Sequence, residues 1–281
     1  MGRSGRGGHY CLRVSQIELV RDEQGGVTVV RDGHPQSYVQ PDDPELLVFE
    51  YVQHLALALD ALTPSAPERV GVTHIGGAGL TLARYVEHTR PGSPQIVLEP
   101  DAELTELVRR ELPLPRGHRI RVRPVDGAQG MAALKDASAD VVVLDAYDDG
   151  RVPADLTSAA FATAASRVIR PGGLLLMNLA DEPGLRYVAR AIATLLPAFP
   201  HVAAVTLQEV LKGKRYGNLV VVASDSPFDV DELRRRTARA DFPTGVLGTA
   251  DLARRARAAT AFDDIGEPSP PPPDPGRWRL R

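Results

Sequence analysis

The glycine-rich turn Gly76-Gly77-Ala78-Gly79 and the acid Glu99 are the first residues of this sequence whose types and spacing suit ligand binding. The turn follows an apolar run and leads into a helical pattern, and Glu99 ends the next apolar run, 20 residues after Gly79. Glycine lets the backbone turn sharply and approach a ligand that a Cβ atom would hold away. An acid at this spacing can accept hydrogen bonds from both hydroxyls of a ribose. The alternative is a plain strand-to-helix turn whose acid caps the next helix, but together these features favour a nucleoside site formed by Gly76, Gly77, Gly79 and Glu99.

Two further acids occupy equivalent positions later in the chain. Asp126, which Gly127 follows, and Asp145 each come directly after an apolar run. Either acid alone could simply cap a helix, but ligands of open α/β sheets bind at the carboxyl ends of the strands. Three acids there fit a nucleoside, with Glu99 on the ribose, Asp126 on the exocyclic amine of adenine and Asp145 near the reacting end. No GKS or GKT follows the glycine turn and the acids would repel a triphosphate, so we predict a cationic adenosyl sulfonium as the ligand rather than ATP.

These residues need a parallel sheet to bring them together, and the hydrophobic pattern supplies one. Apolar runs alternate with helical patterns, and the last two runs are too closely spaced for a helical crossover, which indicates an antiparallel hairpin. The pattern predicts a doubly wound, seven-stranded, mostly parallel sheet with an antiparallel edge hairpin, preceded by a small N-terminal antiparallel β unit. The expected strands of the large sheet lie at residues 70–75, 95–98, 120–125, 140–144, 174–179, 202–207 and 218–223.

Composition shifts divide the chain into five segments. We expect a flexible N-terminus at residues 1–10, a β unit with a helix at 11–66, and a Rossmann-like adenosyl-binding domain at 67–224. C-terminal helices follow at 225–262, and the proline-rich tail at 263–281 is expected to be disordered or extended and dispensable for folding. The helix before the Rossmann-like domain should begin at Asp42-Asp43-Pro44 and contain His54, which we interpret as a core histidine. Trp278 in the tail has no predicted place.

The overall composition excludes several kinds of partner. The net charge of -3 argues against a nucleic-acid-binding surface, and no apolar run reaches the ~18 residues that span a membrane. The single cysteine, Cys11, excludes a disulfide framework and a cysteine metal cluster, and suits a reducing cytoplasm. The first ten residues contain no apolar core, so they do not form a signal peptide. We therefore expect a cytoplasmic protein with no metal, no nucleic-acid partner and no membrane partner. A homodimer stays open.

The order of these elements and acids resembles the class I S-adenosylmethionine-dependent transferases. Within them, the span from about residue 12 to 224 resembles the spermidine synthase (aminopropyltransferase) family. The resemblance is carried by Arg31-Asp32-Gly33, Glu50, His54, the turn IGGAG, Glu99, Asp126-Gly127, the stretch LDAYDD and the closing NLVVVAS. It implies S-adenosylmethionine or its decarboxylated form as co-substrate, a small-molecule acceptor and a role in polyamine biosynthesis. It also implies that Asp145 is the general base that deprotonates an attacking amine, with Asp148 as a second carboxylate.

Three departures from the family concern the diamine. Gly79 stands where the family has an aspartate that holds the aminopropyl nitrogen, and Val48-Phe49-Glu50 replaces Tyr-His-Glu. Leu211-Lys212-Gly213-Lys214 replaces the family's Tyr-Pro-Ser-Gly, which holds the polyamine. A lysine beside a positively charged diamine would repel it, by about 4 kcal/mol for unit charges ~4 Å apart at an effective dielectric constant of ~20. Unless this basic loop points to solvent, it opposes a dication. We therefore expect a retained nucleoside site and poor use of putrescine. The alternatives are methyl transfer to an unknown acceptor and a catalytically silent adenosyl-binding module.

Overall fold

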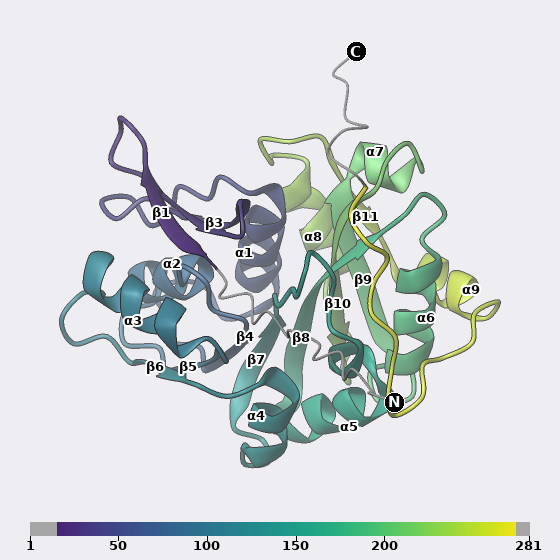
Figure 1. Ribbon diagram of the computed structural model, residues 1–281. Helices are drawn as coiled ribbons and strands as arrows, with labels where there is room; N and C mark the ends of the chain where they lie inside the picture. Colours follow the sequence, from purple (N-terminus) through teal and green to yellow (C-terminus); the bar gives the residue numbers. More distant parts are fainter. Residues whose placement is uncertain (1–15, 274–281) are drawn as a thin grey trace, which may run out of the picture.

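The computed structural model describes residues 16–273 of the chain. Cys11, the first ten residues and Trp278 lie outside this range. No helix within it is long and apolar enough to cross a membrane. Figure 1 shows a small N-terminal sheet beside a large central sheet that carries helices on both faces.

The N-terminal sheet contains β1 (Ile17–Arg21), β2 (Val27–Arg31) and β3 (His34–Val39), which pair antiparallel in chain order. Its buried face consists of Val27, Val29 and Val39, which pack on Leu80 and Val97 of the large domain. The predicted small β unit is confirmed. Because three short strands bury too little apolar surface to be stable alone, the sheet depends on the elements beneath it.

The large sheet has eight strands in the order β11-β9-β10-β8-β7-β4-β5-β6. Its parallel part comprises β4 (Val72–Ile75), β5 (Gln95–Leu98), β6 (Ile120–Arg123), β7 (Ala139–Leu144) and β8 (Ile169–Asp181). The antiparallel part comprises β9 (His201–Leu207), β10 (Gly217–Ser224) and β11 (Thr244–Leu247). The predicted mostly parallel sheet and its hairpin are confirmed, and β11 adds an eighth strand that covers the exposed edge of β9. Its four residues, TGVL, are too few to show a period in the sequence.

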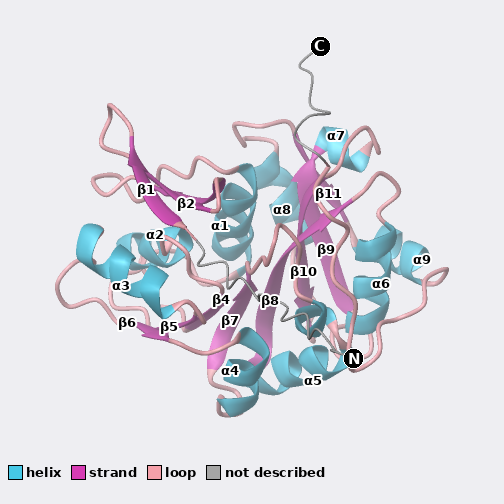
Figure 2. Ribbon diagram, viewed as in Figure 1, coloured by secondary structure: helices cyan, strands magenta, loops and turns pink. Residues whose placement is uncertain are grey.

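Helices pack on both faces because the central strands are apolar on both sides, as buried parallel strands must be. In β7, Val141 and Val143 face α1 (Glu50–Leu62), while Val142 and Leu144 face the opposite layer. Figure 2 shows helices on the two sides of the strands. The first layer holds α1, α2 (Thr81–Thr89) and α8 (Val230–Thr237); the second holds α4 (Gly127–Ala133), α5 (Ala159–Val168), α6 (Arg186–Leu195) and α9 (Thr249–Ala256). Also present are α3 (Ala102–Glu111), the 3-10 turn η1 (Ala154–Thr157) and α7 (Gln208–Leu211).

The start of α1 differs from the prediction. The helix begins at Glu50, not at Asp42-Asp43-Pro44. In the intervening segment only Leu47 is buried, and its carbonyl accepts a hydrogen bond from the Gln53 side chain at 2.6 Å. A helix through this segment would pair that carbonyl with the amide of residue 51 instead. The side-chain bond therefore takes the place of the helical one, and the segment before Glu50 forms turns instead of helix.

Residues 263–273 of the proline-rich tail, for which a disordered or extended form was expected, contain no helix or strand but make specific contacts. Residues 263–273 lie along the protein, and the backbone amide of Val152 donates to Ser269 Oγ at 2.9 Å while Ser269 N donates to the Val152 carbonyl. Arg151 donates to the Ser269 carbonyl, and Glu267 pairs with Arg190. Proline removes backbone donors that would need partners, so a few polar contacts suffice to hold an extended segment. Through these contacts the tail holds Arg151 and Val152, in the loop after β7, in place.

Candidate active site

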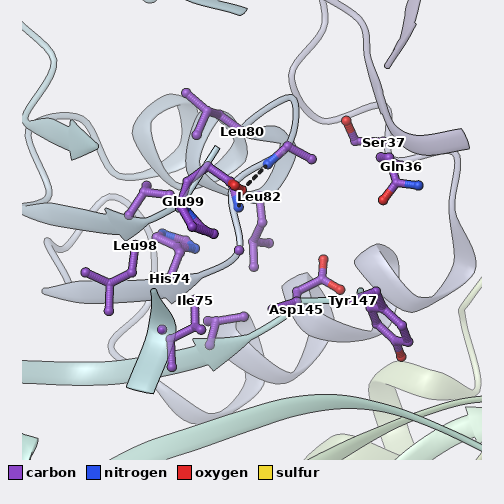
Figure 3. A pocket seen from close by; sticks show the side chains of 18 of the residues that line it. Gln36, Ser37, His74, Ile75, Leu80, Leu82, Leu98, Glu99, Asp145 and Tyr147 are labelled. Carbon is purple, nitrogen blue, oxygen red and sulfur yellow. Dashed lines mark hydrogen bonds between the residues drawn. The ribbon is translucent and has the colours of Figure 1, made fainter. Parts of the chain in front are cut away.

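A cavity of about 420 Å³ lies at the carboxyl ends of β4, β5 and β7. Strand order reverses between β4 and β7, because β5 and β6 continue on one side and β8 on the other. This is the position where open α/β sheets bind ligands. Of the predicted site residues, the cavity lining contains Gly76, Gly77, Glu99, Asp126, Gly127, Asp145 and Asp148. Figure 3 shows Glu99 and Asp145 on different walls of this cavity.

The glycine turn is shaped by close backbone contacts. Gly76 has φ +91°, and a Cβ there would lie 2.1 Å from the Asp145 carbonyl oxygen, so only glycine fits. Gly77 N and Ala78 N donate to Glu99 Oε2 at 2.9 and 3.3 Å. Figure 3 marks hydrogen bonding at the Glu99 carboxylate with a dashed line. Glu99 Oε1 accepts from Asp101 N at 3.0 Å. Glu99 therefore holds the turn in place as well as lining the cavity, a role that the sequence analysis did not identify.

Gly79 is absent from the cavity lining and faces the N-terminal sheet instead. Its amide donates to Ser37 Oγ at 2.9 Å. A Cβ on Gly79 would lie 2.6 Å from Ser37 Oγ and 2.8 Å from a methyl carbon of Val39, closer than real Cβ contacts allow. The glycine is required by the tight contact between the turn and β3, so no acidic side chain fits at this position.

Asp126 caps a helix and also lies in the cavity wall. Its carboxylate accepts from Ala128 N at 2.9 Å and Gln129 N at 3.2 Å, which caps the first turn of α4. The residue also lines the cavity, together with Gly127. A Cβ on Gly127 would lie 2.4 Å from a methyl carbon of Ile75, so this glycine too is needed for close packing.

Asp145 is half-buried and is held by a chain of polar side chains. Asn178 Nδ2 donates to Asp145 Oδ1 at 2.9 Å, and Asn218 Nδ2 donates to Asn178 Oδ1, also at 2.9 Å. Tyr147 completes the group, since its hydroxyl donates to the Asn178 carbonyl and accepts from Asn218. Burial raises the pKa of Asp145 to about 6, against the opposing effect of the Asn178 hydrogen bond. The carboxyl group therefore titrates close to neutral pH, where a general base is most effective.

Several residues that the sequence analysis did not assign also line the cavity. Tyr51 from α1 and Tyr147 lie near Asp145, and burial raises the pKa of both phenols well above its usual value. The N-terminal sheet contributes Arg31, Gln36 and Ser37. Isolated aromatic or polar residues in separate elements leave no spacing signal, because only the tertiary fold brings them together.

Other residues singled out from the sequence lie away from the cavity. His54 is buried and its Nε2 lies 3.1 Å from Thr244 Oγ1, which confirms the interpretation as a core histidine. Lys212 and Lys214 are exposed and are absent from the cavity lining. The basic loop therefore points to solvent, and its charges are not aimed at a bound ligand.

The chain is similar in sequence and in structure to known proteins. No family model matches the chain. A polyamine aminopropyltransferase of Neisseria meningitidis serogroup A is 24% identical over 233 residues, which cover 78% of this chain and 81% of that protein. The crystal structure of a probable spermidine synthase from Corynebacterium glutamicum matches with a TM-score of 0.83 and 29% identity, covering 90% of this chain and 94% of that one.

A more distant structure shares the fold alone. It is a spermidine synthase in complex with the transition-state analogue AdoDATO, with a TM-score of 0.55 and 17% identity over 82% of this chain and 75% of that one. The similar sequence and these two similar structures are all aminopropyltransferases or spermidine synthases. Human methyltransferase-like protein 13 also shares the fold, with a TM-score of 0.54 and 18% identity over 77% of this chain and 96% of that one. The chain is therefore a spermidine synthase-like transferase with a methyltransferase-like fold.

Proposed function

We propose that the protein binds the adenosyl part of S-adenosylmethionine, or of a close relative such as its decarboxylated form, in the cavity at the ends of β4, β5 and β7. The observation that carries this proposal is the meeting of Glu99, Asp126 and Asp145 around the glycine turn in one cavity. Glu99 is assigned to the ribose hydroxyls and Asp126 to the adenine amine. The acidic lining suits the positive sulfonium and disfavours a polyphosphate.

In the proposed reaction Asp145 acts as the general base. It takes a proton from the attacking atom of a small-molecule acceptor, which displaces one alkyl group from the sulfonium while the thioether leaves with the bonding electrons. Asp148, an exposed residue of the cavity lining, is assigned as the second carboxylate for the acceptor. The sulfonium supplies a good leaving group, so the protein contributes mainly orientation, proton transfer and charge.

The first test concerns the ribose contact. Replacing Glu99 with Gln removes the negative charge, so we expect methylthioadenosine to bind about tenfold or more weakly, as for the loss of a charge-assisted hydrogen bond. Isothermal titration calorimetry measures this directly. Glu103→Gln, an exposed change in α3, should leave affinity unaltered. Because Glu99 also holds the glycine turn, the melting temperatures of the wild-type and variant proteins without ligand are compared as a folding control. Unchanged affinity in a folded Glu99→Gln protein refutes the ribose assignment.

The second test uses the titration of Asp145. Its pKa is raised from 3.8 in the unfolded chain to about 6 in the folded protein, so the charged carboxylate costs stability, and the full cost appears only above pH 6. Asp145→Asn should therefore stabilise the protein at pH 7.5 by on the order of 3 kcal/mol, with a smaller gain at pH 5. Turnover should be lost in the same variant.

Thermal unfolding at the two pH values measures the effect, with about 2–4 °C expected per kcal/mol. Asp42→Asn removes the same charge at an exposed position, serves as the matched control and should leave the melting temperature at both pH values unchanged. If Asp145→Asn is no more stable than the wild-type protein at pH 7.5, or gains no more there than at pH 5, the raised pKa of Asp145 is refuted.

The third test concerns putrescine, which we propose is a poor acceptor. Gly79 offers no carboxylate for a bound ammonium group, and Val48 and Phe49 lack the polar groups of the family's Tyr and His. Each lost carboxylate partner reduces affinity by about ten- to a hundredfold. With putrescine and decarboxylated S-adenosylmethionine at saturation, mass spectrometry should detect little or no spermidine. Turnover on the order of one per second would refute the proposal.

A further inference from the structure

The N-terminal sheet occupies the part of the cavity wall next to the glycine turn. Ser37 accepts the amide hydrogen of Gly79 and, with Val39, fills the space that a side chain on that residue would need. An acid cannot be placed there without moving β3. The chemistry of this wall is therefore determined by the side chains of the sheet itself.

A β-bulge directs two neighbouring side chains of β3 into the cavity. The pairing of β2 with β3 shifts from Val29 opposite Ser37 to Val30 opposite Pro35, which leaves Gln36 as an extra residue. In a regular strand, Gln36 and Ser37 would point to opposite faces. A bulge breaks this alternation and re-aims a side chain. Both residues line the cavity, and Figure 3 shows them together on one side of it.

The charge of this wall is positive. Arg31, the last residue of β2, also lines the cavity, and its nearest described ion partner is Asp101 at 3.7 Å, a loose contact for a side chain that is 38% exposed. The described side chains that the sheet contributes to the lining are thus one guanidinium, one amide and one hydroxyl, with no carboxylate. Ser37 Oγ accepts from Gly79, so its own hydrogen can be donated to a ligand. The guanidinium attracts an anionic oxygen group and repels an ammonium group, and the amide and hydroxyl can donate to the same anionic oxygens.

We infer that the cavity takes a sulfonium nucleoside that retains its amino-acid carboxylate, as intact S-adenosylmethionine does, with Arg31, Gln36 and Ser37 holding that carboxylate. This inference rests on the proposed adenosyl site and decides between the two forms of the co-substrate. The adenosyl part contacts the glycine turn, Glu99 and Asp126, while the carboxylate of the tail lies toward β2 and β3.

The test compares three probes by calorimetry: S-adenosylmethionine, its decarboxylated form and methylthioadenosine, which lacks the tail. The wild-type protein should bind S-adenosylmethionine about tenfold or more tightly than the decarboxylated form. Arg31→Gln should weaken S-adenosylmethionine about ten- to a hundredfold and leave methylthioadenosine within about twofold. Arg21→Gln removes the same charge from β1, outside the cavity lining, and should change none of the three affinities.

A second variant guards against misfolding of Arg31→Gln. Gln36→Glu adds a carboxylate at the bulge and should weaken S-adenosylmethionine while strengthening the decarboxylated form, which reverses the preference. If the wild-type protein prefers the decarboxylated form, or if Arg31→Gln weakens all three probes equally, the carboxylate assignment is refuted. Failure of methylthioadenosine to bind at all refutes the adenosyl site itself, so the two failures are distinguishable.

Discussion

The carboxylate of Glu99 is the contact on which the geometry of the cavity depends. It accepts hydrogen bonds from the amides of Gly77 and Ala78 with one oxygen and from Asp101 with the other, and so ties the turn after β4 to the end of β5. Gly76 of this turn lies against the backbone of Asp145, and Gly79 lies against the N-terminal sheet. Three separate strands and the small sheet are therefore held at fixed distances around one cavity. A nucleoside that binds Glu99 would use an acceptor already oriented by the backbone.

Asp145 faces the same cavity under different electrostatic conditions. Burial raises its pKa to about 6, and the hydrogen bond from Asn178 opposes this rise. Asn218 fixes the orientation of the Asn178 amide, because its own Nδ2 donates to the amide oxygen and leaves the nitrogen facing Asp145. The balance keeps the carboxyl group ready to exchange a proton near neutral pH. It also stores unfavourable charge in the folded protein, which is a common cost of a functional site.

The sequence predicted most of the architecture because the strands are long or strongly apolar and the glycine turn has a distinctive pattern. It did not predict β11, whose four residues form a strand only because β9 offers an edge. The start of α1 was misplaced because local capping signals do not reveal that the Gln53 side chain, rather than a helical amide, pairs with the Leu47 carbonyl. The composition of residues 263–273 predicted a disordered or extended tail, but composition does not reveal the partners that Val152 and Arg151 provide.

The candidate site shows the same division. Glu99, Asp126 and Asp145 could be placed from sequence since each follows a buried strand of a parallel sheet. The need for glycine at position 79 could not be predicted, because the side chains that leave no room for a Cβ there, Ser37 and Val39, lie about 40 residues earlier in the chain. Arg31, Gln36 and Ser37 were not assigned to the cavity because a bulge is a property of two paired strands rather than of one. The pairing of β2 with β3 therefore determines which side chains reach this wall of the cavity.

The most direct measurement is a crystal structure of the protein with methylthioadenosine. We expect the ribose hydroxyls ~3 Å from the Glu99 carboxylate, the adenine beside Asp126 and the sulfur toward Asp145. Density for the nucleoside anywhere else, or in this cavity with its ribose turned away from Glu99, would contradict the account.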